Sequence, residues 1–327
     1  MACSVLSGLI ALALLMAPLR AHTQATVGAD AVYTRVAAVL GAVNGYGLGQ
    51  FQFDPDSRRL FAISTNGLYW CDIDAPKPAW NGPTIKAPMN LLRLAPQLKR
   101  LFFATREELG YVDLDALDTP HLYAKVRAGT MVYEPERSEI YVGYRSEQVL
   151  VFNARTGERS DSIRVPGWSG QLLEAIPGRV FLTVPNKNGL YMINASSHRV
   201  GPWPVDGKIV TPMRIEVDPT GRYIFGAYYQ NIVAIDTATA KVVGRLDSIG
   251  TASIAYDPGA QLLIVNAVTQ PSPARITAYR VSDTGFTLAA TMKSPEDDAI
   301  TLEPTGRGFL QRSRFQWLIW KMDTRRE

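Results

Sequence analysis

The chain has 327 residues, of which 46% are hydrophobic and 20% charged, with a formal net charge of +4 and no low-complexity tract. This composition is that of an ordinary globular protein and excludes a low-complexity chain. The small positive charge does not by itself indicate nucleic acid or an anionic membrane as a partner.

The N-terminus has the pattern of a secretory signal peptide. Residues 4–19 read "SVLSGLIALALLMAPL", and small residues follow at Ala21 and Ala25, although the first four residues contain no Lys or Arg. The apolar run is shorter than the roughly 20 residues that a membrane-spanning helix needs, which favours cleavage over an uncleaved anchor. We therefore expect residues 1–25 to be removed near Ala25, leaving a periplasmic or secreted protein over residues 26–327 with no transmembrane span.

Cleavage would remove Cys3 and leave one cysteine, Cys71, within "GLYWCDID". A single cysteine cannot form an intrachain disulfide, even in the oxidising environment that an exported protein meets. Because Cys71 falls inside a predicted strand, we interpret it as a buried and unreactive thiol.

Seven prolines repeat along the rest of the chain at intervals of 39 to 46 residues. Each one follows a short apolar segment and precedes a turn of Gly, Ser or charged residues, and an acidic residue stands before the proline in five of the seven. Proline presets the backbone for such a tight turn. The seven repeat prolines are Pro55, Pro96, Pro135, Pro177, Pro219, Pro258 and Pro304.

Each repeat contains further strand-like runs rich in Val, Ile, Phe and Tyr. An innermost strand ends at the proline, and second and third strands follow. A more polar fourth strand suits the exposed outer edge. A period near 42 residues with four strands per repeat is typical of a β-propeller, whose blades bury their faces against neighbouring blades. The predicted outermost strands are residues 84–88, 121–126, 159–165, 198–205, 241–246 and 286–292.

The seventh repeat ends after its third strand, so one outermost strand is missing. The segment "AVYTRVAAVL", residues 31–40, has a strand pattern but belongs to no repeat. We predict that it supplies the missing strand. The sequence thus predicts an all-β, seven-bladed β-propeller with four-stranded antiparallel blades, closed by an N-terminal strand in the last blade.

The fifth repeat carries a family resemblance. "YIFGAYYQNIVAIDTATAKVVGRL", residues 223–246, resembles the YVTN-type β-propeller repeat, most closely between Ile232 and Val243. The match is looser at residues 140–163, and no repeat carries the full Tyr-Val-Thr-Asn tetrapeptide. The resemblance implies a seven-bladed propeller of the kind usually exported in bacteria, and it implies no single activity.

Charged residues interrupt the innermost strands at defined positions. Counting back from each proline, the second and fourth positions are apolar, while the third and fifth are mixed. Because side chains alternate along a strand, we expect the mixed positions to face the central channel, which brings Arg93, Glu174, Arg214 and Glu216 near the axis. Either these charges neutralise one another across a water-filled channel, or they form a polar ligand site.

The mouth face, where the innermost strands begin, is bordered by the connections between second and third strands. Cations beside an aromatic ring on this face could receive an anionic or aromatic ligand, whereas solvated loop charges, diluted by acidic residues such as Glu147, are the alternative. We predict a binding site on this face for a small polar or anionic molecule or for a protein partner. Its candidate residues are Arg93, Arg145, Trp168, Arg214, Glu216 and Arg312.

Catalytic signatures are sparse. Besides Cys71, only His121 and His198 remain after cleavage, both on or beside predicted outermost strands, so a zinc site or a Cys/His pair is not expected. We predict no catalytic residue, metal or cofactor, and a monomer. An enzyme of the lactonase or quinoprotein-dehydrogenase type is the alternative, although residues 153–158 lack the Asp of the quinoprotein motif. Nucleic-acid binding is disfavoured because alternating strand faces would scatter the C-terminal arginines.

Overall fold

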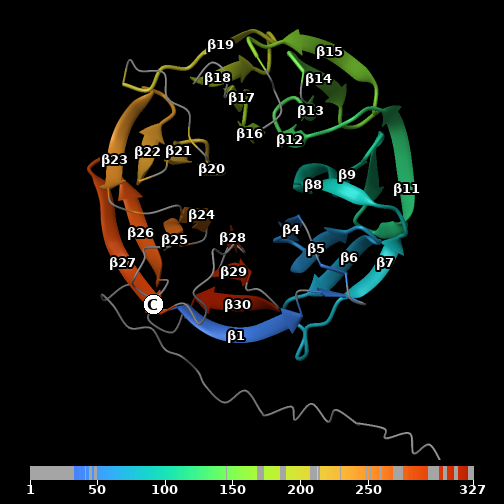
Figure 1. Cartoon of the computed structure of the whole chain (residues 1–327), viewed down its shortest axis with the longest axis horizontal. Helices are drawn as coiled ribbons and strands as arrows, with labels where there is room; N and C mark the ends of the chain where they lie inside the picture. Colours follow the sequence, from blue (N-terminus) through green and yellow to red (C-terminus); the bar gives the residue numbers. More distant parts are fainter. Residues whose placement is uncertain are drawn as a thin grey trace, which may run out of the picture.

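The computed structural model describes residues 33–40, 42–43, 46–47 and 50–322, apart from residues 145, 168–172, 185–188, 207–211, 213, 229, 248, 250–251, 258–259, 268–274, 294–301, 305–307 and 313–315. Within these residues the structure is all-β and contains seven four-stranded antiparallel sheets. The sheets stand around a common axis like the blades of a propeller (Figure 1). The predicted fold class is therefore confirmed.

The strands follow the predicted repeat. Blade 1 consists of β4 (Phe51–Asp54), β5 (Arg59–Ser64), β6 (Gly67–Asp72) and β7 (Asn81–Ile85). Blade 2 consists of β8 (Met89–Ala95), β9 (Arg100–Thr105), β10 (Glu108–Asp113) and β11 (Ala116–Lys125). Blade 3 consists of β12 (Thr130–Glu134), β13 (Glu139–Gly143), β14 (Gln148–Asn153) and β15 (Arg159–Arg164).

The second half of the ring repeats this order. Blade 4 consists of β16 (Leu173–Ile176), β17 (Arg179–Val184), β18 (Gly189–Asn194) and β19 (Val200–Pro202). Blade 5 consists of β20 (Arg214–Val217), β21 (Tyr223–Ala227), β22 (Asn231–Asp236) and β23 (Lys241–Asp247). Blade 6 consists of β24 (Ala252–Asp257), β25 (Leu262–Ala267), β26 (Arg275–Ser282) and β27 (Gly285–Lys293).

Blade 7 joins the two ends of the chain. Its inner strands are β28 (Leu302–Pro304), β29 (Gly308–Arg312) and β30 (Gln316–Met322). The outermost strand is β1 (Tyr33–Leu40), which runs antiparallel to β30 from the pair Tyr33–Met322 to the pair Leu40–Gln316. Figure 1 shows β1 lying beside β30 at the rim of the ring. The predicted closure by an N-terminal strand is confirmed.

Two short strands and one helical turn complete the described secondary structure. Strands β2 (Ala42–Val43) and β3 (Tyr46–Gly47), which lie between β1 and β4 in the sequence, pair with each other. A 3-10 turn (Pro96–Leu98) follows β8. Among the described residues no helix is long and apolar enough to cross a membrane.

Where an acidic residue stands before the repeat proline, its carboxylate shapes the turn after the innermost strand. The Asp54 carboxylate accepts the backbone N–H groups of Asp56 and Ser57 at 3.2 and 3.3 Å. Glu134 does the same in blade 3, and its Oε1 also accepts the N–H of Gly178 in blade 4 at 2.8 Å. The carboxylate satisfies turn donors that no strand partner can reach, which explains why Asp and Glu recur there.

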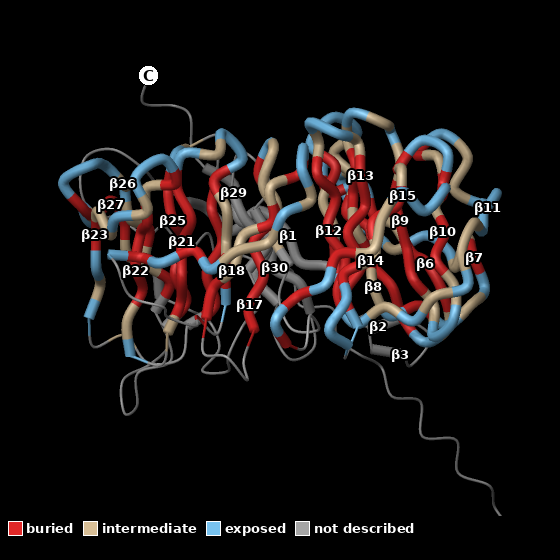
Figure 2. The backbone as a smooth tube through the Cα atoms, turned by 90° about the horizontal axis from the view of Figure 1, so that it is seen from above, coloured by how far each residue is buried: buried red, intermediate tan, exposed pale blue. Residues whose placement is uncertain are grey.

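The hydrophobic core lies between neighbouring blades. Leu92 and Leu94 of β8 pack against blade 1 residues such as Phe61, and Met131 of β12 packs against blade 2. Val132, on the other face of β12, packs against blade 4. Figure 2 shows this burial concentrated in the strands, with exposed residues at the turns. Cys71 is fully buried, and burial raises the pKa of its thiol to about 12, which agrees with an unreactive cysteine.

This packing adds to one sequence-based expectation. The mixed positions of the innermost strands, which were expected to face the channel, also form hydrogen bonds to the neighbouring blade. Gln52 Oε1 accepts the N–H of Leu94 in the next blade at 2.9 Å, and Arg93 Nε donates to Met131 O in the next blade at 3.1 Å. The blades are arranged radially, so the two faces of an innermost strand pack against the two neighbouring blades. The unpaired edge of that strand borders the central channel.

The closure predicts a strong asymmetry between the two chain ends. A protein spanning residues 41–327 lacks β1 and leaves β30 with an unpaired edge, so we expect it to lose a large part of the roughly 5–15 kcal/mol that stabilises a folded protein. A protein spanning residues 26–322, which keeps β1, serves as the control and should match residues 26–327. Urea unfolding followed by tryptophan fluorescence measures both, and equal losses in the two truncations would contradict the closure.

Candidate functional site

The two faces of the ring differ in the connections that form them. The mouth face carries the connections between second and third strands and those that lead into the innermost strands. The opposite face, here called the turn face, carries the repeat-proline turns and the turns between third and outermost strands. Arg214 is the first residue of β20 and so lies at the mouth face, with Glu216 two residues further in.

The charge of Arg93 is balanced by a carboxylate two blades further along the ring. Its Nη2 lies 3.6 Å from Glu174 Oε1 of β16, which belongs to blade 4, while its Nε is bonded to blade 3. Burial raises the pKa of the Glu174 carboxyl, and the nearby Arg93 guanidinium opposes that shift. The interpretation of mutually compensating charges therefore holds for this pair.

Arg214 differs from Arg93. Its side chain is exposed, and its Nη1 donates to Ser253 Oγ of blade 6 at 3.1 Å. No carboxylate among the described residues forms an ion pair with it. Glu216 is half-buried, and its Oε1 accepts the N–H of Tyr256 at 3.4 Å. Arg214 is thus a positioned guanidinium whose charge the described residues leave available.

Sequence reasoning missed the role of the innermost glutamines. Gln50 Oε1 accepts the backbone N–H of Leu92, and Gln52 uses Leu94 in the same way. Together with Arg93, Arg214 and Glu216, they connect the innermost strands of blades 1, 2 and 5 to those of the following blades. The common signal is a polar side chain at the third or fifth position before the proline.

The remaining predicted site residues are only partly within view. Arg145 and Trp168 lie outside the described residues. Arg312 ends β29 at the mouth face, and its backbone pairs with that of Trp317 in β30. Its side chain is outside the description. The structure thus brings Arg93, Arg214 and Glu216 around the axis and says nothing of the other three side chains.

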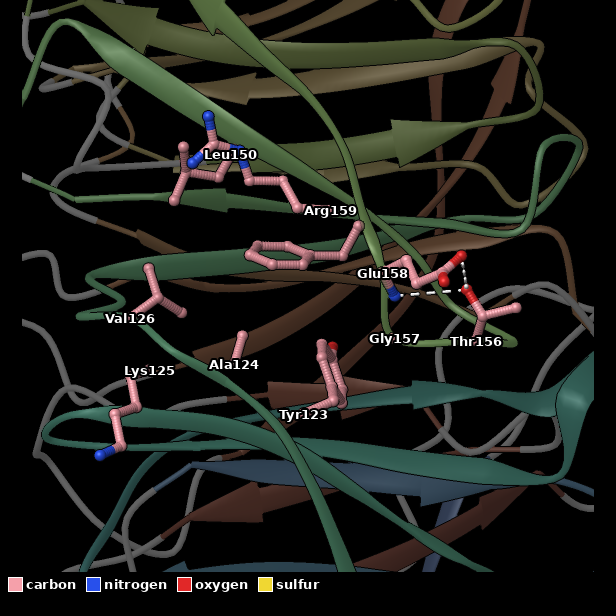
Figure 3. Close-up of a pocket in the computed structure, with 10 residues that line it drawn as sticks. Tyr123, Ala124, Lys125, Val126, Leu150, Thr156, Gly157, Glu158 and Arg159 are labelled. Carbon is pink, nitrogen blue, oxygen red and sulfur yellow. Dashed lines mark hydrogen bonds between the residues drawn. The ribbon is translucent and has the colours of Figure 1, made fainter.

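A second concave feature lies between blades 2 and 3, away from the axis. One cavity of about 370 Å³ is lined by the end of β11, by β14 and by the turn that leads into β15 (Figure 3). A neighbouring cavity of about 210 Å³ shares Val126 and Leu150 with it and extends to Tyr144 and Gln148. We call the two together the side groove. The sequence patterns had not indicated it.

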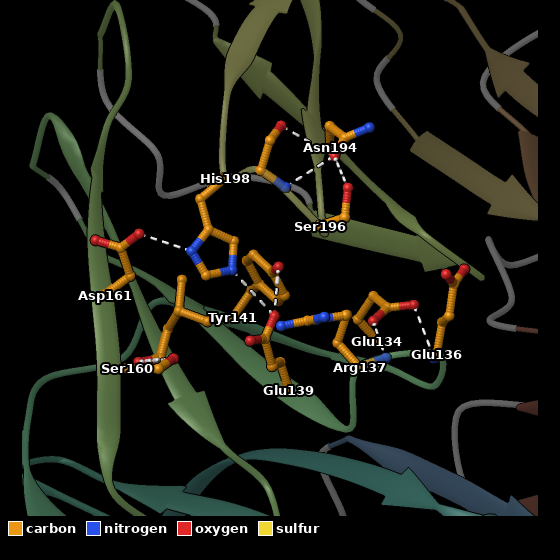
Figure 4. Close-up of polar contacts among 12 residues, drawn as sticks. Glu134, Glu136, Arg137, Glu139, Tyr141, Ser160, Asp161, Asn194, Ser196 and His198 are labelled. Carbon is orange, nitrogen blue, oxygen red and sulfur yellow. Dashed lines mark hydrogen bonds and ion pairs between the residues drawn. The ribbon is translucent and has the colours of Figure 1, made fainter.

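A polar cluster at the turn face joins blades 3 and 4 (Figure 4). His198 lies between two carboxylates: its Nδ1 is 2.6 Å from Asp161 Oδ2, and its Nε2 is 3.2 Å from Glu139 Oε2. Tyr141 also donates its hydroxyl to Glu139 Oε2 at 2.8 Å, and burial together with this bond raises the pKa of Tyr141. Only an imidazole protonated on both nitrogens can donate to both carboxylates at once.

In other blades too, the first residue of the second strand contacts a turn of the following blade, as Glu139 contacts His198. Arg100, the first residue of β9, donates to Ala154 O in the next blade at 2.9 Å, and Arg179, the first residue of β17, donates to Thr237 O at 2.7 Å. Glu139 is the first residue of β13. These contacts tie the second strands of blades 2, 3 and 4 to a turn of the following blade, so the cluster serves as a connection between blades 3 and 4.

No group of His, Cys, Asp and Glu side chains suited to a metal ion occurs in the part of the chain that the structure describes. His121 is far from His198, on β11, where its ring stacks on Tyr111 at 4.9 Å between centroids. As predicted, both histidines lie on or beside outermost strands.

Comparisons with known proteins bear on the fold. No protein-family model and no curated protein matches the sequence. The fold is similar to a chain of the solved structure of U3-55K, at 6% identity and a TM-score of 0.64, covering 86% of this chain and 97% of that one. It is also similar to a chain in the crystal structure of a mitotic checkpoint complex, at 13% identity and a TM-score of 0.66, covering 98% and 99%. Identities this low show a shared propeller fold alone.

Replacing His198 tests the connection between blades 3 and 4. His198→Ala leaves the buried Glu139 carboxylate with Tyr141 as its remaining side-chain donor, so we expect a loss of about 1–3 kcal/mol in the free energy of unfolding. His121→Ala, at the exposed histidine, should change it by less than about 0.5 kcal/mol. Urea denaturation measures both, and similar effects in the two variants would contradict the role given to His198.

The Asp161 carboxylate is expected to make the stability of the folded protein depend on pH in the acid range. The N–H of Ser162 and the imidazole of His198 hold the pKa of its carboxyl below the ordinary value. A lowered folded-state pKa stabilises the protein above the unfolded value of about 4, and this contribution is lost as the pH falls through the folded value.

Asp161→Asn should therefore lose less stability than the wild type between about pH 5 and about pH 3. Asp115→Asn provides a control at an exposed aspartate and should lose as much as the wild type. The melting temperature measured across this range decides the point. Parallel curves for the wild type and Asp161→Asn would show that the carboxylate has no such role.

Proposed function

We propose that this protein is an exported, non-catalytic β-propeller that binds an anionic ligand at its mouth face. The ligand is a small molecule carrying carboxylate or phosphate groups, or the acidic side chains of a protein partner. Arg214 is the central contact. Arg93, Glu216, Arg145, Trp168 and Arg312 complete the proposed site.

The exposed guanidinium of Arg214 carries this proposal. Its bond to Ser253 at 3.1 Å fixes its position, and no described carboxylate pairs with it. A guanidinium recognises carboxylate and phosphate groups through parallel hydrogen bonds, and an arginine already held in place loses less entropy on binding. Arg93 contributes less, because Glu174 already balances its charge.

The shared fold offers limited support for a protein partner. The similar chain from the mitotic checkpoint complex belongs, by its description, to an assembly of proteins. A propeller can therefore serve as a component of a complex. The pattern of residues 1–25 supports export, and the mass of the mature protein would test it, since cleavage near Ala25 removes that segment.

Thermal stability in the presence of anions tests the site at Arg214. We expect citrate or inorganic phosphate to raise the melting temperature of the wild type, because a ligand bound only by the folded state adds about 2.7 kcal/mol at a concentration of 100 times its Kd. Arg214→Ala should abolish the increase while leaving the melting temperature of the free protein nearly unchanged. Arg214→Lys keeps the positive charge but loses the parallel N–H donors of the guanidinium, and it should retain part of the increase in melting temperature.

The matched control is Arg137→Ala, which removes an exposed arginine from the turn face. It should respond to both anions as the wild type does. An equal loss of response in Arg137→Ala and Arg214→Ala would show that the anions act through the overall positive charge of the protein and not through a site at Arg214. If neither anion stabilised the wild type, the proposal of an anionic ligand would be overturned.

A further inference from the structure

The side groove runs along one strand for its whole length. Its blade 3 wall includes Gln148, Leu150 and Phe152, which alternate along β14 and so share one face. The groove reaches Tyr144 towards the mouth face and Thr156 at the turn face, so it follows a six-residue strand of about 20 Å. Its shape fits an extended segment of polypeptide.

The floor of the groove is apolar and aromatic. Leu150, Tyr123 and Val126 are half-buried, which leaves part of each surface in contact with solvent. Tyr144, at one end, is 39% exposed, an unusual value for a large aromatic residue in this structure. Partly exposed apolar surface in a concave site is the usual source of affinity for a ligand's hydrophobic side chains.

One glycine lets a turn of blade 3 pack closely against Tyr123 at the edge of the groove. Gly157 has a φ of +76° and closes the turn before β15 directly over Tyr123. A Cβ atom at this position would lie 2.7 Å from Tyr123 Cβ, which is too close for any contact. The turn can therefore sit against the ring of Tyr123, and Figure 3 shows Gly157 and Tyr123 at the same end of the cavity.

The charges around the groove are predominantly positive. Lys125, Arg127 and Arg159 line it and are exposed, and none of them forms an ion pair with a described residue. Among the described residues of the lining, Glu158 is the one acidic residue, and its Oε2 accepts a hydrogen bond from Thr156 Oγ1 at 3.3 Å. Figure 3 shows Lys125 and Arg159 on opposite sides of the cavity. The carboxylates of an acidic occupant would meet complementary charge on both sides of the groove.

We propose that the side groove binds an extended acidic peptide segment of a partner protein, about six residues long. Apolar side chains of the segment would pack on Leu150 and Tyr123. Its carboxylates would pair with Lys125 on the blade 2 wall and Arg159 on the blade 3 wall. This site is separate from the mouth face and does not depend on the anion site proposed there.

Selection from a random octapeptide library displayed on phage tests the proposal on the mature protein. We expect the recovered peptides to combine several Asp or Glu residues with Leu, Phe or Met. Synthetic fluorescein-labelled copies should bind at least tenfold more weakly to the double variant Lys125→Glu/Arg159→Glu. Both residues are exposed, so circular dichroism and melting temperature should stay as in the wild type.

Two controls separate the groove from its surroundings. Lys241→Glu/Arg280→Glu makes the same change of charge at exposed residues of blades 5 and 6 and should leave peptide affinity unchanged. Arg137→Ala, which removes an exposed arginine of blade 3 outside the groove lining, should also leave it unchanged. Peptides that bind the Lys125→Glu/Arg159→Glu variant as well as the wild type, or a selection that yields no acidic peptides, would refute the proposal.

A second copy of the chain is the competing occupant. Light scattering would then show a dimer for the wild type and a monomer for Lys125→Glu/Arg159→Glu, and the assignment to a partner's peptide would be wrong. A wild-type monomer that binds the selected acidic peptides supports it.

Discussion

The pairing of β1 with β30 is the constraint on which this ring depends. Every other blade is built from consecutive segments, whereas blade 7 joins strands from the two ends of the chain. The entropy cost of bringing two distant segments together grows only slowly with the number of residues between them. The hydrogen bonds and packing of a full strand pair can therefore offset the cost of this long-range closure. Without it, blade 7 would present an open edge, and the faces of the first and last blades would have no fixed neighbours.

Local sequence patterns predict most of this architecture. Each repeat proline marks the end of an innermost strand, and the carboxylate before it, as in Asp54 and Glu134, completes the turn through short-range hydrogen bonds. Such contacts lie within three residues of each other, which is why the repeat is visible in the sequence. The same holds for Cys71, whose burial follows from its place in a strand covered on both faces.

The direction of the inner side chains could not be obtained in this way. Alternation separates the residues of a strand into two faces, but it does not say which neighbour each face meets. Arg93 was expected to lie near the axis and to be balanced by charges of other blades, and it does reach Glu174 of blade 4, but alternation did not predict that its Nε also donates to Met131 O of the next blade. The Glu139–His198 contact escaped notice for a related reason: its partners are separated by 59 residues in the sequence and lie in different blades.

Gly157 links the fold and the side groove. A side chain at this position would collide with Tyr123, and its positive φ already disfavours residues other than glycine. The stability of blade 3 and the shape of the groove therefore both require that residue 157 has no Cβ atom. Lys125 and Arg159 are under no such restriction, since both extend into solvent. Substitutions at Lys125 and Arg159 could thus change which ligand the groove prefers during evolution. The shape of the groove would meanwhile be kept by the requirement that blade 3 folds.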